Sequence, residues 1–267
     1  MMKKVKIALF AVIMGTISVS CNSSDNEPYK PDPNKGDFVK VARMTVSSDG
    51  NKEHLVETRY DIEYNNFLKL RRISEYKNYN ELEAPSNPLL KYEFDYLKNN
   101  ALNSIAITNS EGIEYDKLTA SYKNDYLNDL TGKKSSFVYE HSSGNVVKAI
   151  SGEKVYNYSY DNRGNLTSVS DATGELFTYT YGTGNNPFMY SEYNLTFDYL
   201  PGGELIRFVQ SSKNNIEAAT NKKTGEVYTF KTTASHEFGF PTRIEVKGKD
   251  SFKLFKFDYV IIREPEK

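Results

Sequence analysis

The stretch YSYDNRGNLTSVSDATGELFTYTYG, residues 158–182, decides the fold. Aromatic residues alternate with polar ones at Tyr158 and Tyr160, and again at Phe177, Tyr179 and Tyr181. A period of two places such residues on one face of a strand. The segments DNRG and DATG between them suit hairpin turns that end in a glycine with positive φ. This stretch therefore predicts consecutive antiparallel strands that share an aromatic face.

Turn signals of this kind recur at intervals of about ten residues. Most pair polar residues with a following glycine, as in NSEGI (109–113), HSSGN (141–145) and KKTGE (222–226). The 267 residues include 21 Tyr, 15 Phe and 16 Gly, a composition that suits half-buried strands joined by tight turns. We expect an all-β protein, a long antiparallel meander of roughly 14 strands in a single domain over residues 38–263. Residues 78–90 and 213–221 are expected to interrupt it.

A weak internal repeat runs through the meander. Its core is an aromatic residue followed by Asp or Asn, a turn and an apolar residue. Copies are YNNFLKLRRI (64–73), FDYLKNNALNSI (94–105), VYEHSSGNVVKAI (138–150), YSYDNRGNLTSV (158–169) and FDYLPGGELIRF (197–208), with a fading copy at FGFPTRIEV (238–246). Each unit is a hairpin that cannot bury one face alone, so the units must stack on their neighbours.

A meander of this length protects its edges by closing or curling. We therefore expect a soluble barrel or rolled sheet with the aromatic side chains inside. The opposite face of the strands carries Asn157, Ser159, Lys256 and Asp258, and the chain ends in a polar tail, residues 264–267. A membrane-spanning barrel needs a continuous apolar outer face, so this pattern disfavours a pore.

The stretch 158–182 resembles the YD repeat of RHS-type proteins, with Tyr-Asp, a glycine, a leucine, a second glycine and Tyr-x-Tyr in order. Those proteins use many repeats to enclose a toxin, whereas this chain has about five and no toxin segment, so the shell function does not carry over. With its N-terminus, the whole chain resembles a group of Bacteroidetes lipoproteins of unknown function that have a porin-like β fold. That resemblance implies a large curled antiparallel sheet and no activity.

The N-terminus, MMKKVKIALFAVIMGTISVSC, is typical of an exported lipoprotein. Lysines precede a short apolar run, and small residues lead to Cys21, the one cysteine. The segment resembles a loose lipobox, which implies a signal peptide over residues 1–20 and a lipidated Cys21 carrying acyl chains such as palmitate. An ordinary secretory signal is the alternative. Residues 21–37 are polar and proline-rich and predict a flexible tether.

The anchor predicts an outer-membrane protein whose first partner is the membrane itself, through Cys21. Asp25 and Glu27 resemble the acidic stretch that sends some Bacteroidetes lipoproteins to the cell surface, which favours a surface-facing over a periplasm-facing domain. A net charge of −1 gives no electrostatic footprint for nucleic acid.

No catalytic motif accompanies this architecture. His54, His141 and His236 have no second metal ligand at a recognisable spacing, so no metal and no cofactor is predicted. His141 is expected to lie solvated in a turn. The carboxylate of Asp161 is expected to accept a backbone N–H of its own turn.

We expect a non-enzymatic binding or interaction module. Its ligand would be a glycan, a peptide or an envelope protein, held by tyrosines beyond those that fill the interior: Tyr76, Tyr79, Tyr190 and Tyr193. Two alternatives stay open, a periplasm-facing structural protein of the envelope and a hydrolase with a carboxylate pair. Two carboxyl groups about 5–10 Å apart in a concave pocket would favour the hydrolase.

Overall fold

The computed structural model describes residues 37–48, 55–80, 87–189 and 212–263. Within these ranges the chain forms sixteen β-strands and no helix. The strands are β1 (Asp37–Ser47), β2 (Leu55–Tyr64), β3 (Leu70–Asn80), β4 (Leu90–Tyr96), β5 (Leu102–Asn109), β6 (Glu114–Lys123), β7 (Tyr126–Thr131), β8 (Ser136–Ser142), β9 (Asn145–Ser151), β10 (Lys154–Tyr160), β11 (Leu166–Asp171), β12 (Gly174–Asn185), β13 (Asn214–Asn221), β14 (Val227–Ser235), β15 (Pro241–Lys247) and β16 (Phe252–Arg263).

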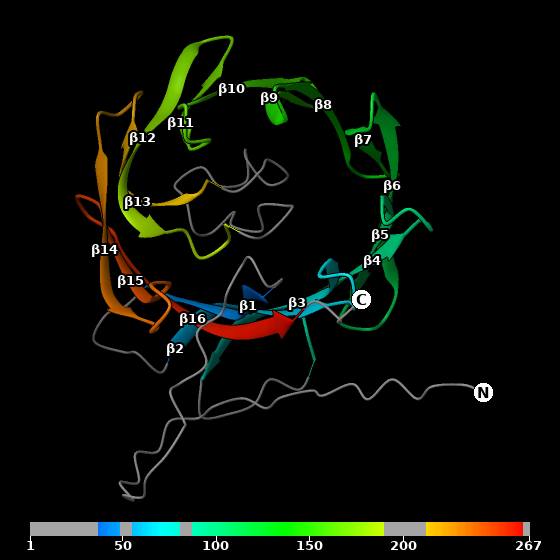
Figure 1. Cartoon of the computed structure of the whole chain (residues 1–267), viewed down its shortest axis with the longest axis horizontal. Coiled ribbons are helices and arrows are strands. Elements are labelled where there is room, and N and C mark those ends of the chain that lie inside the picture. Colours follow the sequence, from blue (N-terminus) through cyan, green and yellow to red (C-terminus); the bar gives the residue numbers. More distant parts are fainter. Residues whose placement is uncertain (1–36, 49–54, 81–86, 190–211, 264–267) are drawn as a thin grey trace, which may run out of the picture.

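The strands form a closed antiparallel barrel. Each strand pairs with its neighbours in sequence, and β1 pairs with β16 to close the ring (Figure 1). The expected all-β meander is therefore confirmed, and it closes completely rather than ending in an open roll. Full closure leaves no unpaired edge along the barrel wall.

The strand number exceeds the expected fourteen because two short turns escape notice in the sequence. Asn124 and Asp125 both have positive φ, as a two-residue hairpin turn between β6 and β7 requires. Gly152, also with positive φ, joins β9 to β10 over an equally short distance. Neither turn has the longer polar-polar-glycine signature of the neighbouring turns. In the sequence, each pair of short strands that such a turn joins therefore resembles a single strand.

The expected interruption at residues 213–221 is wrong, because Asn214–Asn221 is strand β13. Its alanines suit a helix as well as a strand, which hides it from a propensity argument. In the barrel, β12 and β14 pair with both of its edges, and Ile216 and Ala219 are buried on its inner face. Tertiary pairing decides the structure of this segment.

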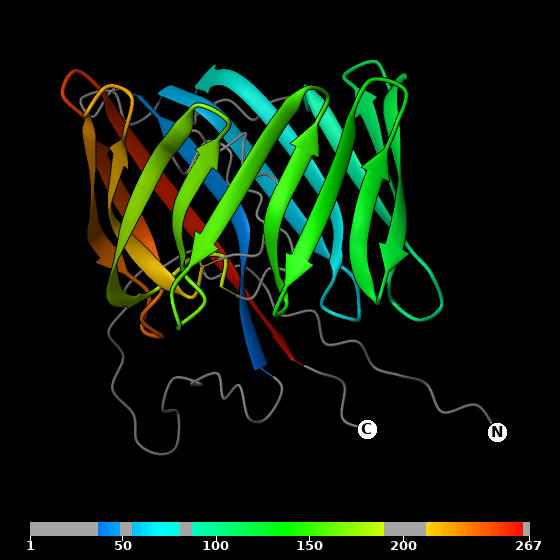
Figure 2. The ribbon, with the colours of Figure 1, turned by 90° about the horizontal axis from the view of Figure 1, so that it is seen from above.

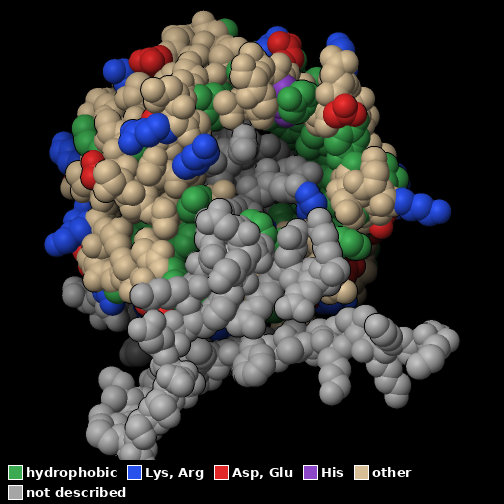
Figure 3. Space-filling model, in the orientation of Figure 1, with side chains coloured by type: hydrophobic (Ala, Val, Ile, Leu, Met, Phe, Trp, Pro, Cys, Tyr) green, Lys and Arg blue, Asp and Glu red, His purple; other side chains and the backbone are tan. Residues whose placement is uncertain are grey.

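The aromatic residues of the opening stretch line the inner wall, as expected. Tyr156 and Tyr158 are buried, whereas Asn157 and Ser159, which alternate with them along the strand, are exposed. They belong to one continuous cluster of buried side chains that includes Val169, Tyr179 and Phe257. Seen along the barrel, hydrophobic side chains appear around the inner rim, and most of the charged side chains in view lie toward the outer perimeter (Figure 3).

The outer wall carries ion pairs in the middle of its strands. Arg43 of β1 pairs with Asp61 of β2 at 2.8 Å, and Arg72 of β3 pairs with Glu93 of β4 at 2.8 Å. On the other side of the barrel, Lys148 pairs with Glu140 at 2.6 Å. The described residues contain no helix long and apolar enough to cross a membrane.

Strand β1 begins and strand β16 ends at the same end of the barrel, the lower end in Figure 2. We call this the terminal end. The turns that follow even-numbered strands, at residues 65–69, 97–101, 124–125, 143–144, 161–165 and 236–240, lie at this end because the strands alternate in direction.

Candidate functional site

A repeated hydrogen bond shapes the inside of the terminal end. Near the end of seven even-numbered strands, an aromatic side chain donates a hydrogen bond to a backbone carbonyl of the preceding strand. The acceptor is an apolar residue near the start of that strand, except in β1, where it lies further along the strand. We call this set the aromatic ladder. Its donor–acceptor pairs are Tyr64–Val41, Tyr96–Leu70, Tyr122–Leu102, His141–Leu127, Tyr160–Val146, Tyr181–Leu166 and Tyr259–Pro241, at 2.5–3.0 Å. The ladder joins each of these seven strands to the strand before it.

The turns of the terminal end are held by their own side chains. Asp161 Oδ1 accepts the backbone N–H groups of Arg163 and Asn165 at 2.8 and 2.9 Å, which confirms the expected role of this carboxylate. Gly164 has a φ of +86°, which closes the turn. Burial would raise the pKa of Asp161, but hydrogen bonds from the backbone and side chain of Asn165 and from Arg163 hold it below its usual value.

The tyrosines of β10 and β12 serve this scaffold. Burial raises the pKa values of Tyr158, Tyr160, Tyr179 and Tyr181 above the usual range. They therefore stay protonated at neutral pH, and the hydroxyls of Tyr160 and Tyr181 donate hydrogen bonds to backbone carbonyls. These side chains fill and join strands.

His141 occupies a tyrosine position of the ladder. It lies on β8, half-buried, so the expectation of a solvated turn residue is wrong. Its Nε2 is 2.7 Å from the Leu127 carbonyl, and because a carbonyl only accepts, Nε2 carries the hydrogen. The ring stacks on Tyr126, with centroids 5.0 Å apart. The internal repeat holds the signal, since Tyr139-x-His141 aligns with Tyr158-x-Tyr160.

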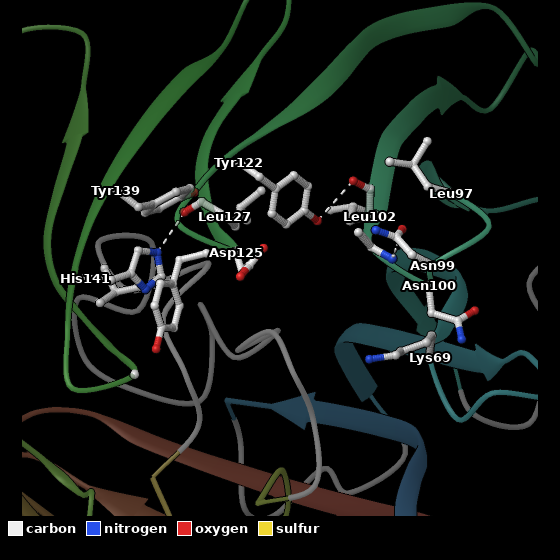
Figure 4. A pocket seen from close by; sticks show the side chains of 14 residues that line it. Lys69, Leu97, Asn99, Asn100, Leu102, Tyr122, Asp125, Leu127, Tyr139 and His141 are labelled. Atoms are coloured by element: carbon white, nitrogen blue, oxygen red, sulfur yellow. Dashed lines mark hydrogen bonds between the residues drawn. The ribbon is translucent and has the colours of Figure 1, made fainter.

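A cavity of about 710 Å³ opens beside His141 at the terminal end. Three neighbouring hairpins form it: β4–β5, β6–β7 and β8–β9, with one residue from the β2–β3 turn (Figure 4). Its main lining side chains are Lys69, Leu97, Asn99, Asn100, Tyr122, Asp125, Tyr126, Leu127, Tyr139 and His141.

Aromatic and polar groups are both accessible in this cavity. Tyr122 is 37 % exposed and Tyr126 is 45 % exposed, more than the tyrosines that fill the core. Asp125 lies between Tyr122 and His141, and Asn99, Asn100 and Lys69 lie across the space from it (Figure 4). Flat apolar faces combined with a few convergent polar groups are what small-ligand sites offer.

The tyrosines predicted from the sequence lie elsewhere. Tyr76 is on β3, and its ring faces outward beneath the Arg59 guanidinium, 5.2 Å from it. The backbone of Tyr79 pairs with Val56, but its side chain lies outside the described residues. Tyr190 and Tyr193 lie outside the described residues as well, as does Cys21. Of these four tyrosines only Tyr76 has a described side chain, and it does not line the cavity.

Tyr122 and Tyr126 were missed, although a signal exists for both. They flank the Asn124–Asp125 turn at the rim of the barrel. No strand continues beyond this turn to cover the edges of the two aromatic rings. Recognising this two-residue turn would have placed both at the mouth of the barrel.

The buried carboxylates of the described residues are engaged in structural contacts. Glu75 faces inward and pairs with Lys77 at 3.2 Å, and the Tyr92 hydroxyl donates to it at 3.3 Å. Asp116 accepts backbone N–H groups from Lys133 and Lys134. Across the described ranges, no group of three or more His, Cys, Asp or Glu side chains is placed to hold a metal ion.

No protein-family model matches the chain, and no curated protein does. Among solved structures it is similar to a porin-like protein from Bacteroides uniformis, with a TM-score of 0.52 and 12 % identity, over 82 % of this chain and 98 % of the other. This match confirms the porin-like barrel fold that the sequence resemblance implies, and the fold alone.

Two further matches are weaker in shape. A porin-like protein from Bacteroides vulgatus has a TM-score of 0.36 and 11 % identity, over 84 % of this chain and 99 % of its own. A Tc holotoxin pore from Photorhabdus luminescens has a TM-score of 0.26 and 9 % identity, over 78 % of this chain and 14 % of its own. Neither carries an argument about this protein.

Proposed function

We propose that this protein is a membrane-anchored binding module that takes a small polar ligand into the cavity of the terminal end. The cavity carries the proposal: its volume of about 710 Å³ lies within the range of roughly 300–1,000 Å³ that small-molecule sites occupy. Its lining combines accessible tyrosine faces with a carboxylate, an ammonium group and two amides. The protein acts by binding, not by catalysis.

The anchor in this proposal is lipid on Cys21, and the barrel itself stays out of the bilayer. Ion pairs such as Arg43–Asp61 and Arg72–Glu93 on the outer wall support this, because lipid-facing strands require an apolar band. Strand β1 starts sixteen residues after Cys21. A flexible tether of that length spans about 20–24 Å, so the terminal end would stay near the outer-membrane surface.

The chain contains no tryptophan, which allows a direct test. The variant Tyr126→Trp places the one indole at the cavity. The matched control Tyr115→Trp places it at the opposite end, on a side chain that is 48 % exposed against 45 % for Tyr126. We expect at least one compound from a panel of short peptides, amino acids and oligosaccharides to shift the emission of the Tyr126→Trp protein alone. Equal shifts in both proteins, or none at millimolar ligand, would contradict the proposal.

Tyr76 remains a predicted contact for a ligand that extends over the outer wall. In that case, Tyr76→Ala weakens binding without unfolding the protein. Unchanged affinity would remove Tyr76 from the site.

Location is tested separately by protease treatment of intact and lysed cells. We expect cleavage on intact cells, and loss of membrane association in Cys21→Ser. Protection until lysis would place the domain in the periplasm, and membrane retention of Cys21→Ser would contradict the lipid anchor.

A further inference from the structure

We propose that the ligand of the terminal cavity is a short peptide with a free N-terminus, whose ammonium group binds the Asp125 carboxylate. This inference rests on the proposed function and adds the chemical class of the ligand. It begins from the β6–β7 turn, where Asp125 lines the cavity together with two accessible tyrosines, Tyr122 and Tyr126.

Asp125 has a backbone conformation that favours glycine. Its φ is +65° and that of Asn124 is +52°, the geometry of a type I′ turn. Glycine is the preferred second residue of such a turn, because a side chain there is strained. Aspartate is one of the few residues besides glycine that tolerates this conformation, and here it places a carboxylate on the cavity lining. Its carboxylate has no hydrogen bond or ion pair with another described side chain, so its charge is available to a ligand.

The surroundings of Asp125 suit an ammonium group. The Tyr122 and His141 rings lie on either side of the Asp125 carboxylate (Figure 4), and the His141 ring stacks on Tyr126. Aromatic faces attract cations, and a carboxylate forms a charge-assisted hydrogen bond with an ammonium. A neutral sugar would use the aromatic faces but would leave the charge of Asp125 without a counterpart.

The far side of the cavity suits the other end of a peptide. Asn99 and Asn100 offer amides to peptide groups, and Lys69 lines the same side of the cavity. Lys69 directly precedes β3 and Asp125 directly follows β6, so three strand-to-strand steps separate them. At about 4.8 Å a step, these span about 14 Å along the wall. Four extended residues cover about 13–14 Å.

Isothermal titration of the wild-type protein with tetra-alanine, N-acetyl-tetra-alanine and maltotetraose tests this inference. We expect tetra-alanine to bind at least about tenfold more tightly than the acetylated peptide, because acetylation removes the ammonium. Asp125→Gly and Asp125→Asn should lose this preference. Asp125→Gly should also unfold at the same or a higher temperature than the wild type, since glycine relieves the strain. Asp250→Asn, in an exposed turn at the opposite end, is the matched control and should bind like the wild type.

Each outcome is decisive. Equal binding of the two peptides, or an unchanged preference in Asp125→Gly, overturns the ammonium assignment. Tighter binding of maltotetraose than of either peptide would keep the cavity as a binding site and overturn the peptide class. If no compound binds the wild type here, and no panel compound moves the emission of Tyr126→Trp, both this inference and the proposed function fail.

Discussion

Replacing Asp161 by alanine removes the acceptor that organises the turn between β10 and β11. In the native turn, its carboxylate accepts the N–H groups of Arg163 and Asn165 and the Asn165 side-chain amide at 3.0 Å. Asn165 is 0 % exposed, so water cannot replace its lost bonds, whereas Arg163 is an exposed residue. Two buried donors without acceptors cost about 1–3 kcal/mol each.

We therefore expect Asp161→Ala to lower the free energy of unfolding by about 2–6 kcal/mol. For a domain of this size, that corresponds to a fall in melting temperature of about 4–24 °C. Asp161→Asn should cost less, about 1–3 kcal/mol, because its amide nitrogen can no longer accept from Asn165 Nδ2 but its Oδ1 can accept the same two backbone N–H groups. Asn65 and Asn109 already do so in turns of the same form.

Urea denaturation of the three proteins at pH 7 measures the difference. If Asp161→Asn is as unstable as Asp161→Ala, the negative charge rather than the acceptor geometry holds the turn. If Asp161→Ala loses less than about 1 kcal/mol, the turn contributes little, and the reasoning is refuted.

Three further predictions concern the scaffold. Tyr160→Phe leaves the Val146 carbonyl without its donor at 2.9 Å and should lose about 1–3 kcal/mol in urea denaturation, whereas Tyr115→Phe on the surface should stay within about 0.5 kcal/mol; equal losses would contradict the ladder. Gly132→Ala would place a Cβ 2.6 Å from Asp116 Oδ1, which hydrogen bonds from the backbone hold in place. We expect the free energy of unfolding to fall by about 1–3 kcal/mol, and wild-type stability would show that the turn can move to accommodate the methyl group. Hydrogen bonds lower the pKa values of Asp161 and Asp116, although burial acts in the opposite direction. Their contribution to the free energy of unfolding is therefore complete above the unfolded pKa of about 4 and is lost as pH falls through the lower folded pKa values. A free energy of unfolding that does not change between pH 5 and pH 2.5 would contradict this.

The barrel was predictable from local signals that agree with each other. The alternation around Tyr156 and Tyr158, and turns such as DNRGN, indicate strand direction and the buried face without any long-range information. Complete closure was not predictable in this way. It depends on the pairing of β1 with β16, across more than two hundred residues of sequence, and no local pattern encodes that contact.

The candidate site was less predictable, since it depends on how neighbouring hairpins align at one end. Asn99, Asp125 and His141 come from three separate repeats, and only the register of the barrel brings them around one cavity. Tyr76 was selected as an exposed loop tyrosine beyond those needed in the interior, but it lies on the outer wall of β3. Choosing tyrosines by position within the repeat, rather than by expected exposure in loops, would have selected Tyr122.

Hydrogen–deuterium exchange of the wild-type protein, with and without tetra-alanine, tests the central claim that the terminal cavity is a ligand site. Ligand that enters the cavity should slow exchange in residues 97–101 and 122–127, which line it. The turns at the opposite end, at residues 109–113 and 152–153, serve as internal controls and should exchange at unchanged rates. Tetra-alanine that binds by titration yet leaves residues 97–101 and 122–127 unprotected, or that protects the opposite end instead, would contradict the account.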